Sequence, residues 1–78
     1  MSATERMIAY HISRLKDKSP QVRIKSIEEL ALLEATDTLS LMEELYRGDP
    51  DQDVRLAAQK AGRVLFRKLN GVSKPPDQ

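Results

Sequence analysis

The sequence has no cysteine, no tryptophan and only one histidine in 78 residues. The absence of cysteine excludes a disulfide framework, a thiolate metal site and a cysteine nucleophile. One histidine excludes the common multi-histidine metal sites. Aromatic residues make up 4% of the chain, which argues against a platform for stacking nucleic-acid bases. The net charge of +1 gives no global field that would drive nucleic-acid or membrane binding.

Long apolar runs are also absent, because the longest uncharged one is Leu30–Leu33. The sequence therefore predicts neither a signal peptide nor a membrane span, and we expect a cytoplasmic protein. The length fits one domain, predicted over residues 1–70. Asn70-Gly71 is a helix-stop signal and Pro75-Pro76 cannot continue a helix, so residues 71–78 are predicted to be a disordered tail.

Helix start and stop signals divide the chain into four segments without strand alternation. Ser2 and Glu5 have capping-box spacing and begin a helix over 3–16. Ser19-Pro20 begins a second helix over 20–34. A third helix, capped by one of the residues 36–38, ends at Gly48, and a fourth, capped by Asp49 or Asp51, ends near residue 69. The main competitor is a three-helix bundle in which one helix is long and kinked.

The second and fourth segments contain an internal repeat with an offset of 32 residues. In the first copy Asp17 is followed by Val22-Arg23-Ile24, and in the second Asp49 is followed by Val54-Arg55-Leu56. Leu33 matches Leu65 in the same register. A helix pair that recurs at this period indicates an α-solenoid.

These residues resemble HEAT repeats, with the best match at Val54–Gly62 and an overall likeness over about residues 6–69. The nearest type is the short HEAT-like repeat of phycobilin-lyase-related proteins. The resemblance implies an all-α fold in which four helices form two helical hairpins, stacked as a short right-handed α-solenoid. Repeat one would cover about residues 3–35 and repeat two about residues 36–69.

The resemblance also implies a structural ladder at the seam between the repeats. Its members would be Asp17, Arg23, Asp49 and Arg55, each aspartate preceding its arginine by six residues. We expect Arg23 to reach Asp49 and bridge the first repeat to the loop of the second. The role is structural, not catalytic.

In the family that the sequence resembles, the second helices of successive repeats line the inner surface, and this likeness implies where a partner docks. Ile24, Ile27 and Leu56 would anchor the partner, while arginines would pair with its carboxylates at the rim. The predicted surface comprises Ile24, Ile27, Glu28, Ala31, Leu56, Gln59, Lys60, Arg63 and Arg67. The alternative is that Ile24, Ile27 and Ala31 are internal residues of the seam.

Three other groups of residues could carry chemistry. His11 has no assignable acid–base neighbour, so we interpret it as a partly buried or edge histidine. Asp49, Asp51 and Asp53 are spaced like the start of a calcium loop, but Lys60 stands where that loop needs glutamate, which favours helix capping. Basic residues of the fourth helix suit its C-terminal dipole better than they indicate nucleic-acid binding.

These observations predict a small non-enzymatic interaction module that binds a partner protein or a second copy of itself. No cofactor and no metal is expected. The alternative, implied by the resemblance alone, is an accessory protein to bilin-bearing antenna proteins, with a lyase-like or chaperone role. Nucleic-acid binding through the basic fourth helix is the least favoured hypothesis.

Overall fold

The computed structural model describes residues 1–71, and the predicted tail otherwise lies outside them. Four α-helices fill most of this part of the chain: α1 (Ala3–Arg14), α2 (Pro20–Leu32), α3 (Leu39–Gly48) and α4 (Gln52–Leu69). A 3-10 helix, η1 (Thr36–Thr38), precedes α3. No strand occurs in the described residues, and none of their helices is long and apolar enough to cross a membrane.

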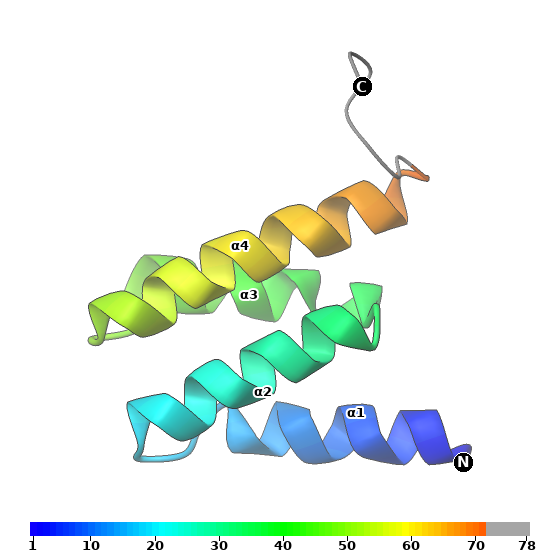
Figure 1. The fold of residues 1–78 in the computed structure, drawn as a ribbon, viewed down its shortest axis with the longest axis horizontal. Helices are drawn as coiled ribbons and strands as arrows, with labels where there is room; N and C mark the ends of the chain where they lie inside the picture. Colours follow the sequence, from blue (N-terminus) through cyan, green and yellow to red (C-terminus); the bar gives the residue numbers. More distant parts are fainter. Residues whose placement is uncertain (72–78) are drawn as a thin grey trace.

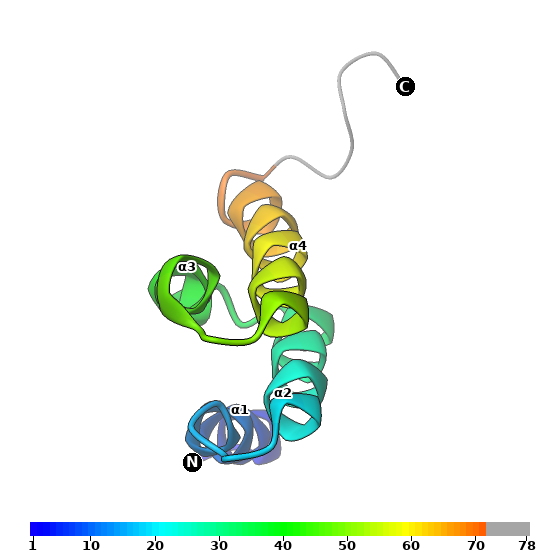
Figure 2. The same cartoon turned by 90° about the vertical axis from the view of Figure 1, so that its left-hand side faces the viewer.

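The helices form two antiparallel pairs, α1–α2 and α3–α4, which stack on one another (Figure 1). Figure 2 shows two layers, with α1 and α3 in one and α2 and α4 in the other. The main contact between the pairs joins α2 to α4, and these two helices run in the same direction. The predicted all-α stack of two helix pairs is confirmed, and its right-handed sense stays a prediction.

Local side-chain caps explain where α1 and α2 begin. Ser2 and Glu5 form the predicted capping box, and the hydrogen bonds that the Ser2 amide and hydroxyl make with Glu5 lower the pKa of its carboxyl. Ser19 Oγ accepts from the amide of Val22 at 3.4 Å, and Pro20 stands at the first helical position. The chain leaves the helix after Arg14 and re-enters at Pro20, so the three-helix alternative is wrong.

Two boundaries of the connection between the pairs differ from the prediction. The helix α2 ends at Leu32 rather than residue 34, because Glu34 adopts a left-handed φ of 55° and turns the chain. The amide of Ala35 then donates to the carbonyl of Leu30 at 3.1 Å. Before α3 the predicted side-chain cap is not formed: the Thr38 hydroxyl instead donates to the carbonyl of Ala35 at 2.7 Å.

The core lies where α2 meets α4 and where α3 packs against α4. Apolar residues recur at helical spacing on these three helices, so their buried faces meet in one cluster. By contrast, α1 contains no fully buried residue and packs against the cluster with partly buried side chains. The largest fully buried side chains are Ile27, Leu30, Met42, Leu65, Val54 and Thr38.

Candidate partner-binding groove

A groove of about 750 Å³ runs between α2 and α4 on the layer that these two helices form. Ile27 and Ala61 are buried beneath it. Three large apolar side chains stand at its rim with much of their surface exposed: Leu32 at 77%, Leu56 at 46% and Val64 at 47%. The remaining lining residues are Ile24, Glu28, Ala31, Asp53, Ala57 and Lys60.

The groove arises because α2 is apolar on two sides. Ile24, Ile27 and Ala31 follow one another at i, i+3 and i+7. Val22 and Ser26, on another side of α2, share a hollow with residues of α1. On α4 the facing positions are the small residues Ala57 and Ala61, so the two helices approach without filling the space above them. Small facing side chains therefore leave an apolar hollow between two parallel helices.

The structure divides the residues predicted to bind a partner. Ile24, Ile27, Glu28, Ala31, Leu56 and Lys60 line the α2–α4 groove. Gln59 and Arg63 line a separate hollow between α3 and α4. Arg67 lines a third one near the C-terminal end of α4. At 100° per residue, positions 59, 63 and 67 lie about 60°, 20° and 20° from position 56 around the helix, so the predicted line stays on one side of α4 and borders all three hollows.

Ile27 has no exposed surface, which corrects the expectation that it is an exposed anchor. A fully buried side chain cannot be reached by a partner, so Ile27 belongs to the seam and supports the groove from below. Ile24 and Ala31 are partly buried and pack against the same core, which also places them at the seam while they line the groove. Of the three predicted aliphatic anchors, Leu56 is the one that is substantially exposed.

The sequence contained a signal for two rim residues that the prediction omitted. Leu32 follows Ile24 by eight residues, and Val64 follows Leu56 by eight residues in the second unit. Eight residues is slightly more than two turns, so each pair lies along one side of its helix. The 32-residue repeat relates Leu32 to Val64, and this shared apolar position could have identified them.

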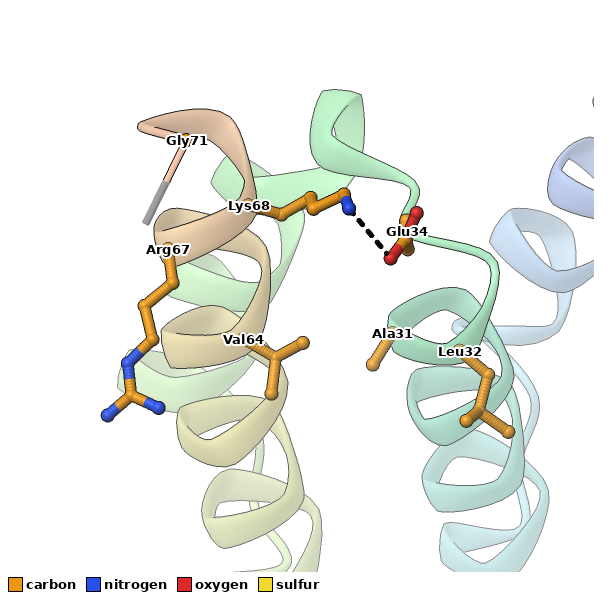
Figure 3. Close-up of a pocket in the computed structure, with 7 residues that line it drawn as sticks. All are labelled: Ala31, Leu32, Glu34, Val64, Arg67, Lys68 and Gly71. Carbon is orange, nitrogen blue, oxygen red and sulfur yellow. Dashed lines mark ion pairs between the residues drawn. The ribbon is translucent and has the colours of Figure 1, made fainter. Parts of the chain in front are cut away.

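At the C-terminal end of the groove, an ion pair joins the turn after α2 to α4. Lys68 Nζ lies 3.2 Å from Glu34 Oε2 across the seam (Figure 3). Arg67, which precedes Lys68 on α4, points away from Ala31 and Leu32 in the same view. The basic residues of α4 therefore do not form one patch, since Lys68 is paired and Lys60, Arg63 and Arg67 line different hollows.

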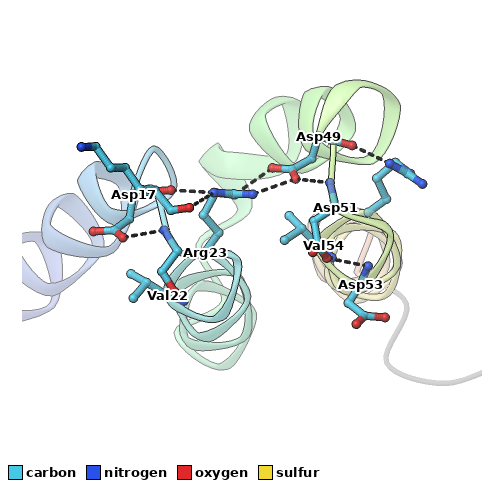
Figure 4. A network of polar contacts seen from close by, with 10 residues as sticks. Asp17, Val22, Arg23, Asp49, Asp51, Asp53 and Val54 are labelled. Carbon is cyan, nitrogen blue, oxygen red and sulfur yellow. Dashed lines mark hydrogen bonds and ion pairs between the residues drawn. The ribbon is translucent and has the colours of Figure 1, made fainter.

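The ladder residues form a hydrogen-bonded row along the loops of the two pairs (Figure 4). Arg23 binds both carboxylate oxygens of Asp49, with Nε to Oδ2 at 2.9 Å and Nη2 to Oδ1 at 3.1 Å. Its Nη1 donates to the carbonyl of Asp17 at 2.6 Å. The side chains of Arg23 and Asp49 are only 11% and 4% exposed, so the contact is shielded from water. The predicted bridge between Arg23 and Asp49 is thus present in the geometry.

The acidic loop uses its carboxylates to cap backbone amides. Asp49 Oδ1 accepts from the amide of Asp51 at 2.9 Å, and Asp51 Oδ1 accepts from Asp53 and Val54 at 2.8 and 3.1 Å. In residues 1–71 no group of three or more acidic or histidine side chains is arranged to hold a metal ion. These contacts give the loop a capping role at the start of α4.

His11 lies at the edge of the first pair and faces no acid–base partner. Its ring meets that of Tyr10 edge to face at 5.1 Å, and its Nδ1 is buried without a hydrogen-bond partner among the described residues. Tyr10, Arg14 and Lys25 line the same shallow hollow. The lining includes the hydroxyls of Tyr10 and Ser26 but no carboxylate, and neither hydroxyl is hydrogen-bonded to His11 Nδ1, so the hollow shows no catalytic pair.

The repeated helix pair, the ladder at its seam and the groove along its second helices define an α-solenoid repeat protein. The family model of HEAT repeats matches residues 3–62, and the chain belongs to that family. HEAT repeats are generally non-enzymatic scaffolds for protein interactions. Searches of curated proteins and of solved structures gave no significant match.

Proposed function

We propose that this protein is an interaction module that seats an amphipathic helix of a partner protein in the α2–α4 groove. The observation that carries the proposal is the ring of exposed Leu32, Leu56 and Val64 around an apolar groove. Exposed apolar side chains gathered around a hollow are typical of a surface that becomes covered. Family membership supports the same class of function.

The dimensions of the groove favour a helix as its occupant. Leu56 and Val64 lie eight residues apart on α4, about 12 Å along its axis at 1.5 Å per residue. Two turns of a partner helix span about 11 Å, so apolar residues at i, i+3 or i+4 and i+7 would meet both anchors. Lys60 lies between the anchors on the groove lining and would pair with an acidic residue on the partner's flank.

The test compares one substitution at two exposed leucines of α4. Leu56→Asp puts a charge into the groove and should weaken partner binding about 30-fold or more, as loss of a central anchor does. Leu69→Asp is the matched control, because Leu69 is 59% exposed and lines none of the hollows described above. Both variants should melt like the wild type, since neither side chain is in the core.

Cross-linking would show whether the captured partner occupies the groove. The sequence has no cysteine, so Lys60→Cys gives a single attachment point in the lining. A photo-cross-linker at that position should join one helical segment of the partner, whose synthetic peptide should then bind the wild type and not Leu56→Asp. If the peptide binds both leucine variants equally, the groove is not the docking site.

The bilin-related alternative predicts a different signal from the same protein. Mixing the chain with a bilin should shift the absorption band if the groove holds a tetrapyrrole, and Leu56→Asp should abolish the shift. An unchanged spectrum at saturating chain concentration would reject this role and leave the protein-binding proposal intact.

A further inference from the structure

The ladder is complete at the seam between the two pairs and open at the second pair. Arg55 repeats the backbone contact of Arg23: its Nη1 donates to the carbonyl of Asp49 at 2.6 Å, the same distance that joins Arg23 to the carbonyl of Asp17. Arg23 also holds the carboxylate of Asp49 with two further donors. Within residues 1–71, no carboxylate occupies the corresponding place at Arg55.

Asp17, at the other end of the row, lacks the bidentate arginine that Asp49 has. Asp17 Oδ1 accepts from the amide of Ser19 at 2.9 Å, as Asp49 Oδ1 accepts from the amide of Asp51. Asp49, however, is also held by an arginine and is 4% exposed, whereas Asp17 is 32% exposed and has Arg14 only at 3.9 Å. Asp17 is therefore oriented by its cap and free to accept a second donor.

We propose that a second copy of this chain stacks on the first head to tail, with Arg55 of one copy binding Asp17 of the next. The contact would repeat the bidentate pair of Arg23 and Asp49 at an offset of one unit. The arginine is held by its Nη1 contact and the aspartate by its amide contact, so both groups are positioned before they meet. This interface uses the two ends of the stack and goes beyond the groove.

Charge at the two ends supports the same arrangement. At the internal seam Ala31 of α2 and Ala61 of α4 line one groove. Moving the seam by 32 residues puts Arg63 in the place of Ala31 and Glu29 in the place of Ala61, so opposite charges meet where two alanines face each other. Both residues are accessible, since Arg63 is exposed and Glu29 is partly so.

Exposed aromatic residues mark the same end of the stack. Tyr46 and Phe66 line a hollow of about 380 Å³ between α3 and α4, together with Gln59, Gly62 and Arg63. By the repeat, Gln59 and Gly62 stand where the first pair has Ile27 and Leu30, which are completely buried. The end that a next unit would cover therefore keeps an apolar hollow, although its centre is less apolar than the internal seam.

A head-to-tail contact uses different surfaces on the two copies, so it does not end at a symmetric dimer. Each added copy presents a new Arg55 and a new Asp17, so the average mass should rise beyond that of a dimer. Sedimentation velocity from about 10 μM to 1 mM covers the range in which weak association is resolved. We expect the wild-type sedimentation coefficient to increase steadily over this range, and less so at high salt.

Two single substitutions separate this interface from any other self-association. Arg55→Gln disables one end and Asp17→Asn the other, and the asparagine keeps an oxygen for the Ser19 amide. Each variant alone should lose association about tenfold or more, as expected when one partner of a charge pair is removed. Mixed one to one, they should form a heterodimer that stops at two chains, because one intact end remains on each.

Circular-dichroism melts establish that both variants fold. Arg63→Glu, a change at an exposed residue, gives a second reading and should weaken association without altering the melt. The proposal is overturned if the wild type stays monomeric at 1 mM or if folded Arg55→Gln and Asp17→Asn associate like the wild type. A mixture of the two folded variants that stays monomeric while the wild type associates would overturn it as well.

Discussion

The helices α2 and α4 begin with the same aspartate and Val-Arg motif, and the structure uses them differently. In the first pair, Ile27 and Leu30 are fully buried, and Ile27 lies beneath the groove shared with the second pair. In the second pair, the same positions are Gln59 and Gly62, which line a hollow at the open end. A few side chains on one face of the second helix thus decide whether a unit lies inside the stack or ends it.

The ladder shows the same contrast in its polar contacts. Arg23 uses Nε, Nη1 and Nη2, and it links the loop of its own pair to that of the next. Within residues 1–71 the side chain of Arg55 makes one hydrogen bond, from Nη1 to the carbonyl of Asp49 in its own loop. A repeated arginine therefore anchors its own loop in each unit and adds a cross-link only where another unit follows.

The largest effect on stability should come from placing a charge at Ile27, the buried position that corresponds to Gln59. Ile27→Asp would bury a carboxylate without a partner, which costs more than about 4 kcal/mol and removes the folded state of a small domain. Gln59→Asp, at the equivalent position of the second unit, should change the melt little. A circular-dichroism melt of both variants checks this, and a folded Ile27→Asp protein would show that the seam tolerates water.

The next effect concerns the buried ion pair between the units. Arg23→Ala leaves Asp49 buried without its arginine and should cost about 3 kcal/mol of unfolding free energy. Arg55→Ala breaks one contact to a carbonyl and should cost about 1 kcal/mol.

Urea melts of Arg23→Ala, Asp49→Ala and the double variant give the coupling energy of the pair. We expect about 2 kcal/mol, because both side chains are shielded from water. A coupling near zero would mean that the pair orients the loops without stabilising the stack.

The features that the sequence predicted correctly are those with a signal within the sequence itself, either between near neighbours or in the internal repeat. The helices followed from local caps such as Ser2, Ser19 and Asp51, whose partners lie two or three residues away. The Arg23–Asp49 contact followed from the internal repeat and from the family resemblance. Helix caps and an internal repeat can both be recognised in a single sequence, so these features could be predicted without the structure.

The parts that were missed depend on side-chain environment. Ile24, Ile27 and Ala31 have the same spacing whether they face solvent or a neighbouring helix. The spacing therefore could not decide whether they form a docking surface or belong to the seam. The turn at Glu34 was missed because a left-handed residue is signalled by glycine or asparagine, and this chain has neither there. The groove exists because Ala57 and Ala61 of α4 face α2 and are too small to fill the space between the helices. The sequence alone does not show which residues of α4 face α2.

A smaller change would make the open end resemble the internal position more closely. Gly62 lies inside α4, where a helical glycine is less stable than alanine by about 0.5–1 kcal/mol. A Cβ at this position would meet Met42 Cβ at 3.9 Å, an ordinary van der Waals contact. Gly62→Ala should therefore raise the unfolding free energy by about 0.5–1 kcal/mol in urea melts, and a loss of stability would show that the α3–α4 contact is tighter than these distances indicate.

The smallest effect should come from the turn that ends α2. Glu34 has a φ of 55°, a conformation that costs a non-glycine residue about 1–2 kcal/mol. Glu34→Gly removes this cost but loses the exposed pair with Lys68 and loosens the unfolded chain, so the net gain should be about 0.5 kcal/mol. Glu34→Ala loses the pair and keeps the strained backbone, so it should be slightly destabilising. If both variants lose the same stability, the ion pair across the seam outweighs the strain of the turn, and the contact between the units is more polar than its buried residues suggest.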